Sequence, residues 1–183
     1  MSKLVRILGA LGVFVIAAVL ATGQEAKPAS PADGHTVHVT APHVVNGKVM
    51  GPYHHYCKVL APDPVIECLC YESNEPGARL HQVEYILAKS ITRNSMTLQS
   101  WNKNWHDHTQ EIATGRVQVL YLPPDKAKEV ADLVATTDGI IYHLWGHDEK
   151  VPGGKVIIAQ SVGHVNLTAA EFKKGAEKKP PAK

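Results

Sequence analysis

Phenylalanine and cysteine are both scarce in this chain. Its 183 residues contain two Phe, Phe14 and Phe172, and three Cys. Between those two positions the aromatic side chains are Tyr and Trp, whose polar atoms need hydrogen-bond partners when buried. We expect these rings either to line a polar pocket or to lie in the core with their polar ends at the surface. The cysteines include no Cys-x-x-Cys pair, which excludes a thioredoxin-like motif, and three are too few for a disulfide-dense miniprotein.

An excess of positive charge is also lacking in the central part of the chain. The formal net charge is +2, and it comes from the two ends. Residues 1–23 contain Lys3 and Arg6 without an acidic residue, and residues 168–183 contain more Lys than Glu, so residues 24–167 are slightly acidic as a whole. Such a folded part offers no surface that follows a phosphate backbone, and we therefore expect no nucleic-acid partner.

The first 23 residues have the pattern of a secretory signal peptide. Lys3 and Arg6 form a short positive region, an uncharged and mostly apolar run follows over residues 7–23, and Ala21-Thr22-Gly23 offers a small-x-small cleavage site. As a helix this run would span about 26 Å, which is short of a hydrocarbon core of about 30 Å. We expect export to the periplasm or the extracellular space after cleavage, with an uncleaved membrane anchor as the alternative.

Composition divides the rest of the chain into three parts. Residues 24–42 are rich in Pro, Ala, Ser and Gly without a sustained apolar period, so they are predicted to form a flexible linker. Residues 168–183 are rich in Lys, and they are predicted to form a disordered tail. The roughly 120 residues between them, 43–167, suffice for a single folded domain and are too few for two.

The hydrophobic pattern of residues 43–167 predicts strands and a few short helices. Alternation over residues 80–87 places Val83, Tyr85 and Leu87 on one face of a strand and Glu84 on the other. Similar patterns predict strands over residues 65–71, 117–122, 140–146 and 155–161, the last two as a hairpin, and helices within residues 90–105 and over 125–136. The predicted fold class is α+β, a single domain with a mainly antiparallel sheet.

Histidine, by contrast, is abundant, with eleven residues. Imidazole and carboxylate groups at this density suit a divalent transition metal such as zinc. A His-x-His pair converges on a strand, whereas on a continuous helix its members lie about 200° apart. We predict that His106 and His108 lie where a helix gives way to a strand or loop, so that both face Glu111. The candidate ligands are His54, His55, His106, His108 and Glu111; the alternative is that these histidines are buried hydrogen-bonding groups.

The pairing of the three cysteines stays open. In an exported protein Cys57 could form a disulfide with Cys68 or with Cys70, which would leave one thiol over. Cys68 and Cys70 point to the same face of a strand, so a bridge between them would be strained. No nucleophile motif surrounds these residues, which favours a structural bridge or buried thiols, and no catalytic residue is assigned.

Four blocks of sequence together resemble those of the plant oil-body-associated proteins and their bacterial relatives. The blocks are HHYC at residues 54–57, ARLHQVEYIL at 78–87, WHDHTQEIATG at 105–115 and GIIYHLWGHDEKVPGGKVII at 139–158. The positions that match the family's pattern are His54, His55, Tyr56, Cys57, Cys68, Arg79, Glu84, Tyr85, Trp105, His106, His108 and Glu111. This chain departs from the family in its export signal, its third Cys and its Lys-rich tail.

The resemblance implies a domain of unknown function whose plant members are associated with seed lipid droplets, with no established catalytic mechanism. Intracellular members carry the pair that matches Cys57 and Cys68 in a reducing compartment, which weakens the idea that this pair exists to form a disulfide. Since the plant members are not exported, a role at droplets does not transfer directly to this chain.

Two functions from different classes follow. The first is a non-enzymatic exported protein with no assignable reaction, acting at a lipid or envelope surface. The second is a metal-binding protein or metal-dependent enzyme that uses the His/Glu cluster. A lipid role requires an exposed apolar face or groove, which no long amphipathic stretch predicts. A metal role requires His blocks that are distant in sequence to converge within about 4–5 Å. The sequence favours the first function by default.

Overall fold

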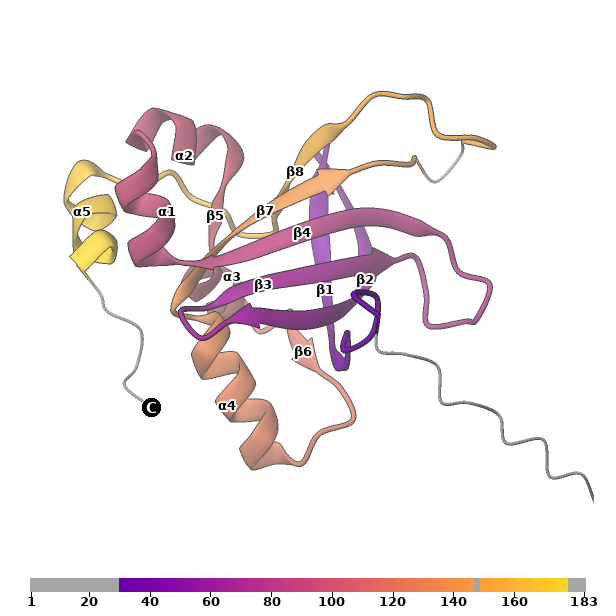
Figure 1. Ribbon diagram of the computed structural model, residues 1–183. Coiled ribbons are helices and arrows are strands. Elements are labelled where there is room, and N and C mark those ends of the chain that lie inside the picture. The colour runs from indigo at the N-terminus through magenta and orange to yellow at the C-terminus, as the bar shows by residue number, and fades with distance from the viewer. Residues whose placement is uncertain (1–29, 147–148, 178–183) are drawn as a thin grey trace, which may run out of the picture. The chain divides into compact units, whose positions relative to one another are not determined.

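Eight strands form a single antiparallel sheet. The computed structural model describes residues 30–146 and 149–177, so the predicted signal peptide, residues 1–23, lies outside the described residues. The described elements belong to one compact unit, Pro31–Lys183 (Figure 1). The strands are β1 (Val37–Val45), β2 (Lys48–Ala61), β3 (Val65–Tyr71), β4 (Leu80–Ala88), β5 (His106–Asp107), β6 (Gln118–Val119), β7 (Thr137–His143) and β8 (Ile157–Ser161). The helices are α1 (Lys89–Ser95), α2 (Leu98–Asn104), α3 (His108–Ala113), α4 (Pro124–Val134) and α5 (Ala169–Glu177).

The sheet closes on itself as a six-stranded barrel. Its strands follow the order β2-β3-β4-β7-β8-β1, and β1 also pairs with β2, which joins the two ends of that order. Every pairing is antiparallel; β6 adds to the edge of β1 and β5 to β7. The predicted single domain with a mainly antiparallel sheet and short helices is confirmed. The closure, which gives the sheet an enclosed interior, is not part of that prediction.

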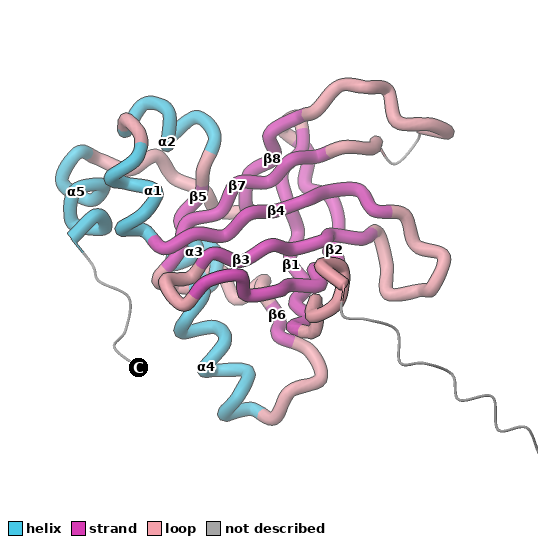
Figure 2. Tube along the Cα trace, in the orientation of Figure 1, coloured by secondary structure: helices cyan, strands magenta, loops and turns pink. Residues whose placement is uncertain are grey.

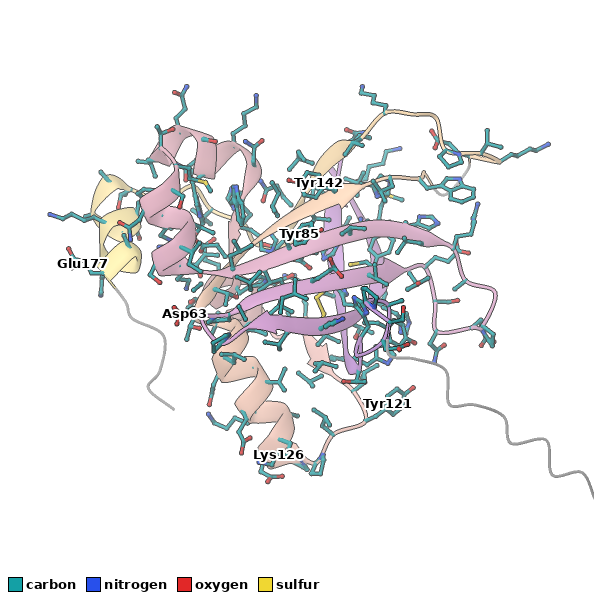
Figure 3. All side chains as sticks on the ribbon, in the orientation of Figure 1. Asp63, Tyr85, Tyr121, Lys126, Tyr142 and Glu177 are labelled. Carbon is teal, nitrogen blue, oxygen red and sulfur yellow. A yellow bond between two sulfur atoms is a disulfide. The ribbon has the colours of Figure 1, made fainter. Side chains whose placement is uncertain are left out.

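Side-chain alternation decides what lies inside the barrel. Along β4, Gln82, Glu84 and Ile86 are buried while Tyr85 is exposed. The predicted alternation is present, and the buried face is the one that carries Glu84. Tyr85 and Tyr142, which neighbour one another on β4 and β7, are labelled on the outer side of the sheet in Figure 3. One buried apolar cluster contains Tyr53, Cys57, Ile66, Cys68, Cys70 and Ile86, and a second contains Val45, Ile141 and Ala159. The interior is therefore a mixture of apolar side chains and buried polar ones.

A disulfide joins neighbouring strands of the barrel. Cys57 on β2 and Cys68 on β3 are directly opposite in the antiparallel register, and their sulfur atoms are bonded (the yellow bond in Figure 3). This is one of the pairings that the sequence leaves open. Cys70, two residues along β3, is a buried free thiol. The bridge closes a loop of 11 residues and so reduces the conformational freedom of the unfolded chain.

Both ends of the domain extend further than composition suggests. The predicted linker 24–42 overlaps β1, which begins at Val37, because residues 37–41 alternate and pair with β2 along their whole length. The predicted tail 168–183 contains α5, in which Phe172 contacts the Trp101 ring and Gly175 lies directly against the Arg93 guanidinium. The tail predicted from its lysine content is therefore ordered over residues 169–177, because Phe172 and Gly175 pack this helix onto the domain.

The predicted helices are present, with shifted ends. Residues 90–105 hold α1 and α2, and α4 begins at Pro124, a residue whose missing N–H suits a first turn. The predicted strand 117–122 is reduced to the two residues of β6. Figure 2 shows α1, α2 and α5 grouped at one side of the sheet, apart from α4. Within residues 30–146 and 149–177, no helix is both long and apolar enough to span a membrane.

Candidate metal centre

Two histidines and two glutamates meet inside the barrel. Glu84 points inward from β4, His106 lies on the short strand β5, and His108 and Glu111 lie on the first turn of α3. All four residues are at least 95% buried. The chain turns from strand to helix between the two histidines, because the side chain of Asp107 caps α3 by accepting a hydrogen bond from the N–H of Thr109 at 2.7 Å.

This turn brings the two imidazoles together. The prediction that both histidines lie on a strand start or loop after a helix is confirmed for His106, which follows α2, and is wrong for His108, which begins α3. The Nε2 atoms of His106 and His108 are 3.2 Å apart. The Oε1 atom of Glu84 lies 3.2 Å from Nε2 of His106 and 3.4 Å from Nε2 of His108. The Oε2 atom of Glu111 lies 3.8 Å and 3.6 Å from the same two nitrogens. Each of the two carboxylate oxygens thus lies within 3.8 Å of both imidazole nitrogens.

The distances of each carboxylate oxygen from the two imidazole nitrogens suit a small ion. Zinc binds His nitrogen at about 2.0–2.1 Å and carboxylate oxygen at about 2.0–2.2 Å, which places tetrahedral ligand atoms about 3.3–3.6 Å from each other. The five distances measured among the four atoms run from 3.2 to 3.8 Å. The ligand atoms of Glu84, His106 and His108 are therefore within reach of one ion, and Glu111 is the carboxylate next to both imidazoles.

Hydrogen bonds on the far side of the His108 ring fix its orientation. Its Nδ1 lies 2.9 Å from Oγ1 of Thr137, and that hydroxyl donates to the carbonyl of Val134 at 2.6 Å. Since the hydroxyl proton is already used, Nδ1–H of His108 is the donor to Oγ1 and Nε2 keeps its lone pair. An outer hydrogen bond of this kind is the usual support of a metal-binding histidine.

The two buried carboxylates of the cluster, Glu84 and Glu111, need positive charge beside them. The ion-pair partners recorded for Glu84 and Glu111 in the described residues are all histidines. Burial by itself raises the pKa of Glu84, but its contacts with His106, His108 and His55 hold that pKa well below its ordinary value. Burial lowers the pKa of His108, but the neighbouring Glu84 and Glu111 carboxylates raise it overall. Without a metal, protonated imidazole must balance the two carboxylates.

The two adjacent candidate histidines, 54 and 55, are separated by the pleat of β2. His55 faces the interior, where its Nε2 lies 3.4 Å from Oε2 of Glu84 and 3.2 Å from Nε2 of His43. His54 faces the other way, and its Nδ1 lies 2.9 Å from Nε2 of His38. His54 is therefore not part of the cluster, because consecutive side chains of a strand point to opposite faces.

Two buried residues at this site, Glu84 and His43, are not among the ligands predicted from the sequence. Glu84 contacts His106 and His108, and His43 contacts His55. Alternation places Glu84 on the strand face opposite to three apolar residues, and it does not state which of the two faces is buried. His43 falls just after the segment assigned to the linker. Each carries a usable signal, since Glu84 lies within one of the four matching blocks and His43 lies on the same strand as the alternating residues 37–41.

A second buried network anchors the segment that carries His106 and His108. Asp107 pairs with Asp138 in the β5–β7 register, and both carboxylates accept hydrogen bonds from Arg93, at 2.8 Å and 2.7 Å. Asp107 also binds Nζ of Lys89 at 2.6 Å, and the indole of Trp101 donates to Asp138 at 2.9 Å. These charges neutralise one another and hold the short strand β5 against β7.

An apolar cavity adjoins the cluster. This apolar chamber has a volume of about 160 Å³ and is lined mainly by aliphatic side chains of β1, β2, β3, β4, β6, α3 and α4. Four polar residues complete its wall: His55, Glu84, His108 and Glu111. Its α4 side consists of Val130, Ala131, Leu133 and Val134, none of which is fully buried. A space of this size can hold a molecule about as large as benzene.

Comparison with known proteins confirms the resemblance that the sequence blocks indicate. Residues 29–180 match the family described as "Protein of unknown function (DUF1264)". Oil body-associated protein 1B of Arabidopsis thaliana is 30% identical over 111 residues, 58% of this chain and 44% of that protein. Oil body-associated protein 2A of Zea mays is 33% identical over 107 residues, 55% of this chain and 40% of that protein. The matches thus span less than half of each relative, and no solved structure matches.

Proposed function

This chain belongs to the family described as "Protein of unknown function (DUF1264)", and we propose that it binds a divalent ion of the zinc class on Glu84, His106, His108 and Glu111. The observation that carries the proposal is the buried grouping of Glu84, His106 and His108, whose ligand atoms lie 3.2–3.4 Å apart, with Oε2 of Glu111 3.6–3.8 Å from the two imidazole nitrogens. Two imidazoles and two carboxylates form a neutral complex with a dication, which removes the cost of two buried negative charges.

Four protein ligands complete a tetrahedron, which is typical of zinc sites that stabilise a fold. Here the ion would join β4, β5 and α3, three elements that no disulfide connects in the described structure. Metal binding requires the imidazoles to lose any extra proton. Because the carboxylates raise the pKa of His108, binding should weaken as the pH falls through that raised pKa.

The proposal is tested by metal analysis of the purified protein after dialysis against zinc. We expect stoichiometric zinc in the parent protein, and loss of zinc from this site in the variant His106→Ala/His108→Ala. We also expect a lower melting temperature in the variant, because the bound ion stabilises only the folded state. The stabilisation by zinc should disappear in the variant, a difference that a purely hydrogen-bonded cluster would not produce.

His54 provides the matched control. It is adjacent to a cluster member and hydrogen-bonded to His38, but it lies on the opposite strand face. His54→Ala should therefore retain zinc at the parent stoichiometry. If the parent protein binds no zinc, or if His54→Ala loses zinc to the same extent as the double variant, a metal site on these residues is wrong.

A second candidate function is that of an exported protein that takes up a small apolar ligand or acts at a lipid or envelope surface. The supporting observation is the apolar chamber, whose wall includes Val59, a residue that is 53% exposed. The names of the plant relatives associate those proteins with oil bodies. Intact-mass analysis of exported protein would test cleavage after residue 23, since a mass that retains residues 1–23 would indicate a membrane anchor.

The chamber makes the ligand role testable with toluene as the probe. We expect toluene to shift the NMR signals of methyl groups that line the chamber, as apolar cavities of this volume bind aromatic molecules of this size. Ala131→Phe on α4 should fill the space and abolish the shifts, whereas Lys128→Phe, on the exposed side of the same helix, should preserve them. Equal shifts in both variants would place toluene elsewhere and contradict a ligand role for the chamber.

A further inference from the structure

We infer that Glu84 bridges two metal positions, the second of which is formed by its Oε2 atom together with His43 and His55. This inference rests on the proposed function, since the first position is the site of His106, His108 and Glu111. The second set comes from three strands of the barrel, β1, β2 and β4. All three of its residues are at least 97% buried.

The distances of the second set match those of the first. Nε2 of His55 lies 3.2 Å from Nε2 of His43 and 3.4 Å from Oε2 of Glu84. The three ligand atoms all lie within 4.8 Å of one another. Two imidazole nitrogens and a carboxylate oxygen at this spacing are within reach of one ion with bonds of about 2.0–2.2 Å.

When both imidazoles are neutral, the hydrogen bonds on their Nδ1 atoms leave a lone pair on each Nε2, next to Oε2 of Glu84. Nδ1 of His55 lies 3.0 Å from the carbonyl of Tyr53, which can only accept, so the neutral imidazole keeps a lone pair on Nε2. Nδ1 of His43 lies 2.6 Å from Oε1 of Gln82, whose amide nitrogen is 3.0 Å from Nδ1 of His143. With Gln82 donating to His143 and accepting from His43, Nε2 of His43 also carries a lone pair.

A cation satisfies all three acceptors at once. Two lone pairs and a carboxylate facing each other at 3.2–3.4 Å repel unless a proton or a metal lies between them. The outer hydrogen bonds to Tyr53 and Gln82 orient both rings in the manner of metal-supporting groups.

The two oxygens of Glu84 serve different histidines. Oε1 contacts His106 and His108, and Oε2 contacts His55. A carboxylate that binds one ion through each oxygen is a bridge, and ions bridged in two-metal sites lie about 3.5–4 Å apart. A single buried carboxylate is thereby neutralised from both sides, which explains why it faces three histidines.

The second position differs from the first in having an open place. Two His and one Glu are three protein ligands, the set that leaves the fourth position of zinc to water or substrate. His55 and Glu84 also line the apolar chamber. The chemical class implied is therefore a divalent metal with an exchangeable water at the polar end of an apolar space, the arrangement that generates a metal-bound hydroxide near neutral pH.

Metal stoichiometry tests this inference without identifying any ligand. Protein stripped with a chelator and titrated with Zn²⁺ or Co²⁺ should bind two equivalents. His43→Ala should bind one, His106→Ala/His108→Ala should lose the other, and Glu84→Gln should weaken both. His38→Ala, which removes a buried histidine whose partner is His54 outside the cluster, is the control and should still bind two.

The outcomes separate this inference from the proposed function. One equivalent in the parent protein, lost in His106→Ala/His108→Ala and unchanged in His43→Ala, overturns the second position and leaves the first intact. No bound metal overturns both. Because His43→Ala could disturb folding, the parent protein offers an independent measurement: two Co²⁺ ions that share the Glu84 bridge should show magnetic coupling, and two uncoupled ions would overturn the bridge.

Discussion

Replacing Asp138 with asparagine is expected to lower the free energy of unfolding by about 3–5 kcal/mol, as removal of one partner from a buried ion pair does. The carboxylate is fully buried and accepts hydrogen bonds from Arg93 at 2.7 and 2.9 Å, from Thr92 at 2.5 Å and from Trp101 at 2.9 Å. In the variant only Asp107 would balance the buried guanidinium. The melting temperature should fall by about 6–20 °C.

A matched substitution of an exposed aspartate shows whether burial is the cause. Asp132→Asn removes an ion pair with Lys128 on α4, where both side chains are more than 60% exposed, and should change stability by at most about 0.5 kcal/mol. Chemical denaturation of both variants measures the difference directly. Equal losses in the two variants would mean that the Asp138 network does not stabilise the fold as the structure indicates.

Replacing Gly139 with alanine is expected to weaken zinc binding about 10–100-fold although no ligand is changed. A Cβ at this position would lie 2.5 Å from Oε1 of Glu84 and 2.6 Å from Nε2 and Cε1 of His106. Gly139 is opposite His106 in the β5–β7 register, and the added Cβ would point at both ligands. Both ligands must move, and changes that misorient ligands typically cost about 10–100-fold in metal affinity.

Overpacking should also destabilise the variant by about 1–3 kcal/mol. Gly77→Ala is the control, because its added Cβ meets nothing within 4 Å and zinc affinity should not change. Isothermal titration with zinc compares the two variants with the parent protein. Unchanged zinc affinity in Gly139→Ala would argue that the metal does not use Glu84 and His106 together.

Local pattern in the sequence predicts much of this domain correctly. Alternation over residues 80–87 places Glu84 opposite to Tyr85, and the structure has this arrangement. The predicted change from helix to strand is present before His106, where α2 gives way to β5, but His108 begins α3 and does not lie on the predicted strand or loop. Such predictions succeed because strand and helix periods depend only on neighbouring residues.

Tertiary structure alone decides which of these residues share the site. Side-chain alternation along a strand places Glu84 and Tyr85 on opposite faces of the sheet. Only closure of the sheet makes the face of Glu84 the interior of the barrel. That closure depends on pairings such as His43 with Ser161, more than a hundred residues apart in sequence. The same closure selects His55 over His54 and adds His43, because a barrel brings inward-facing residues of distant strands to one point, and no local pattern records which strands will be neighbours.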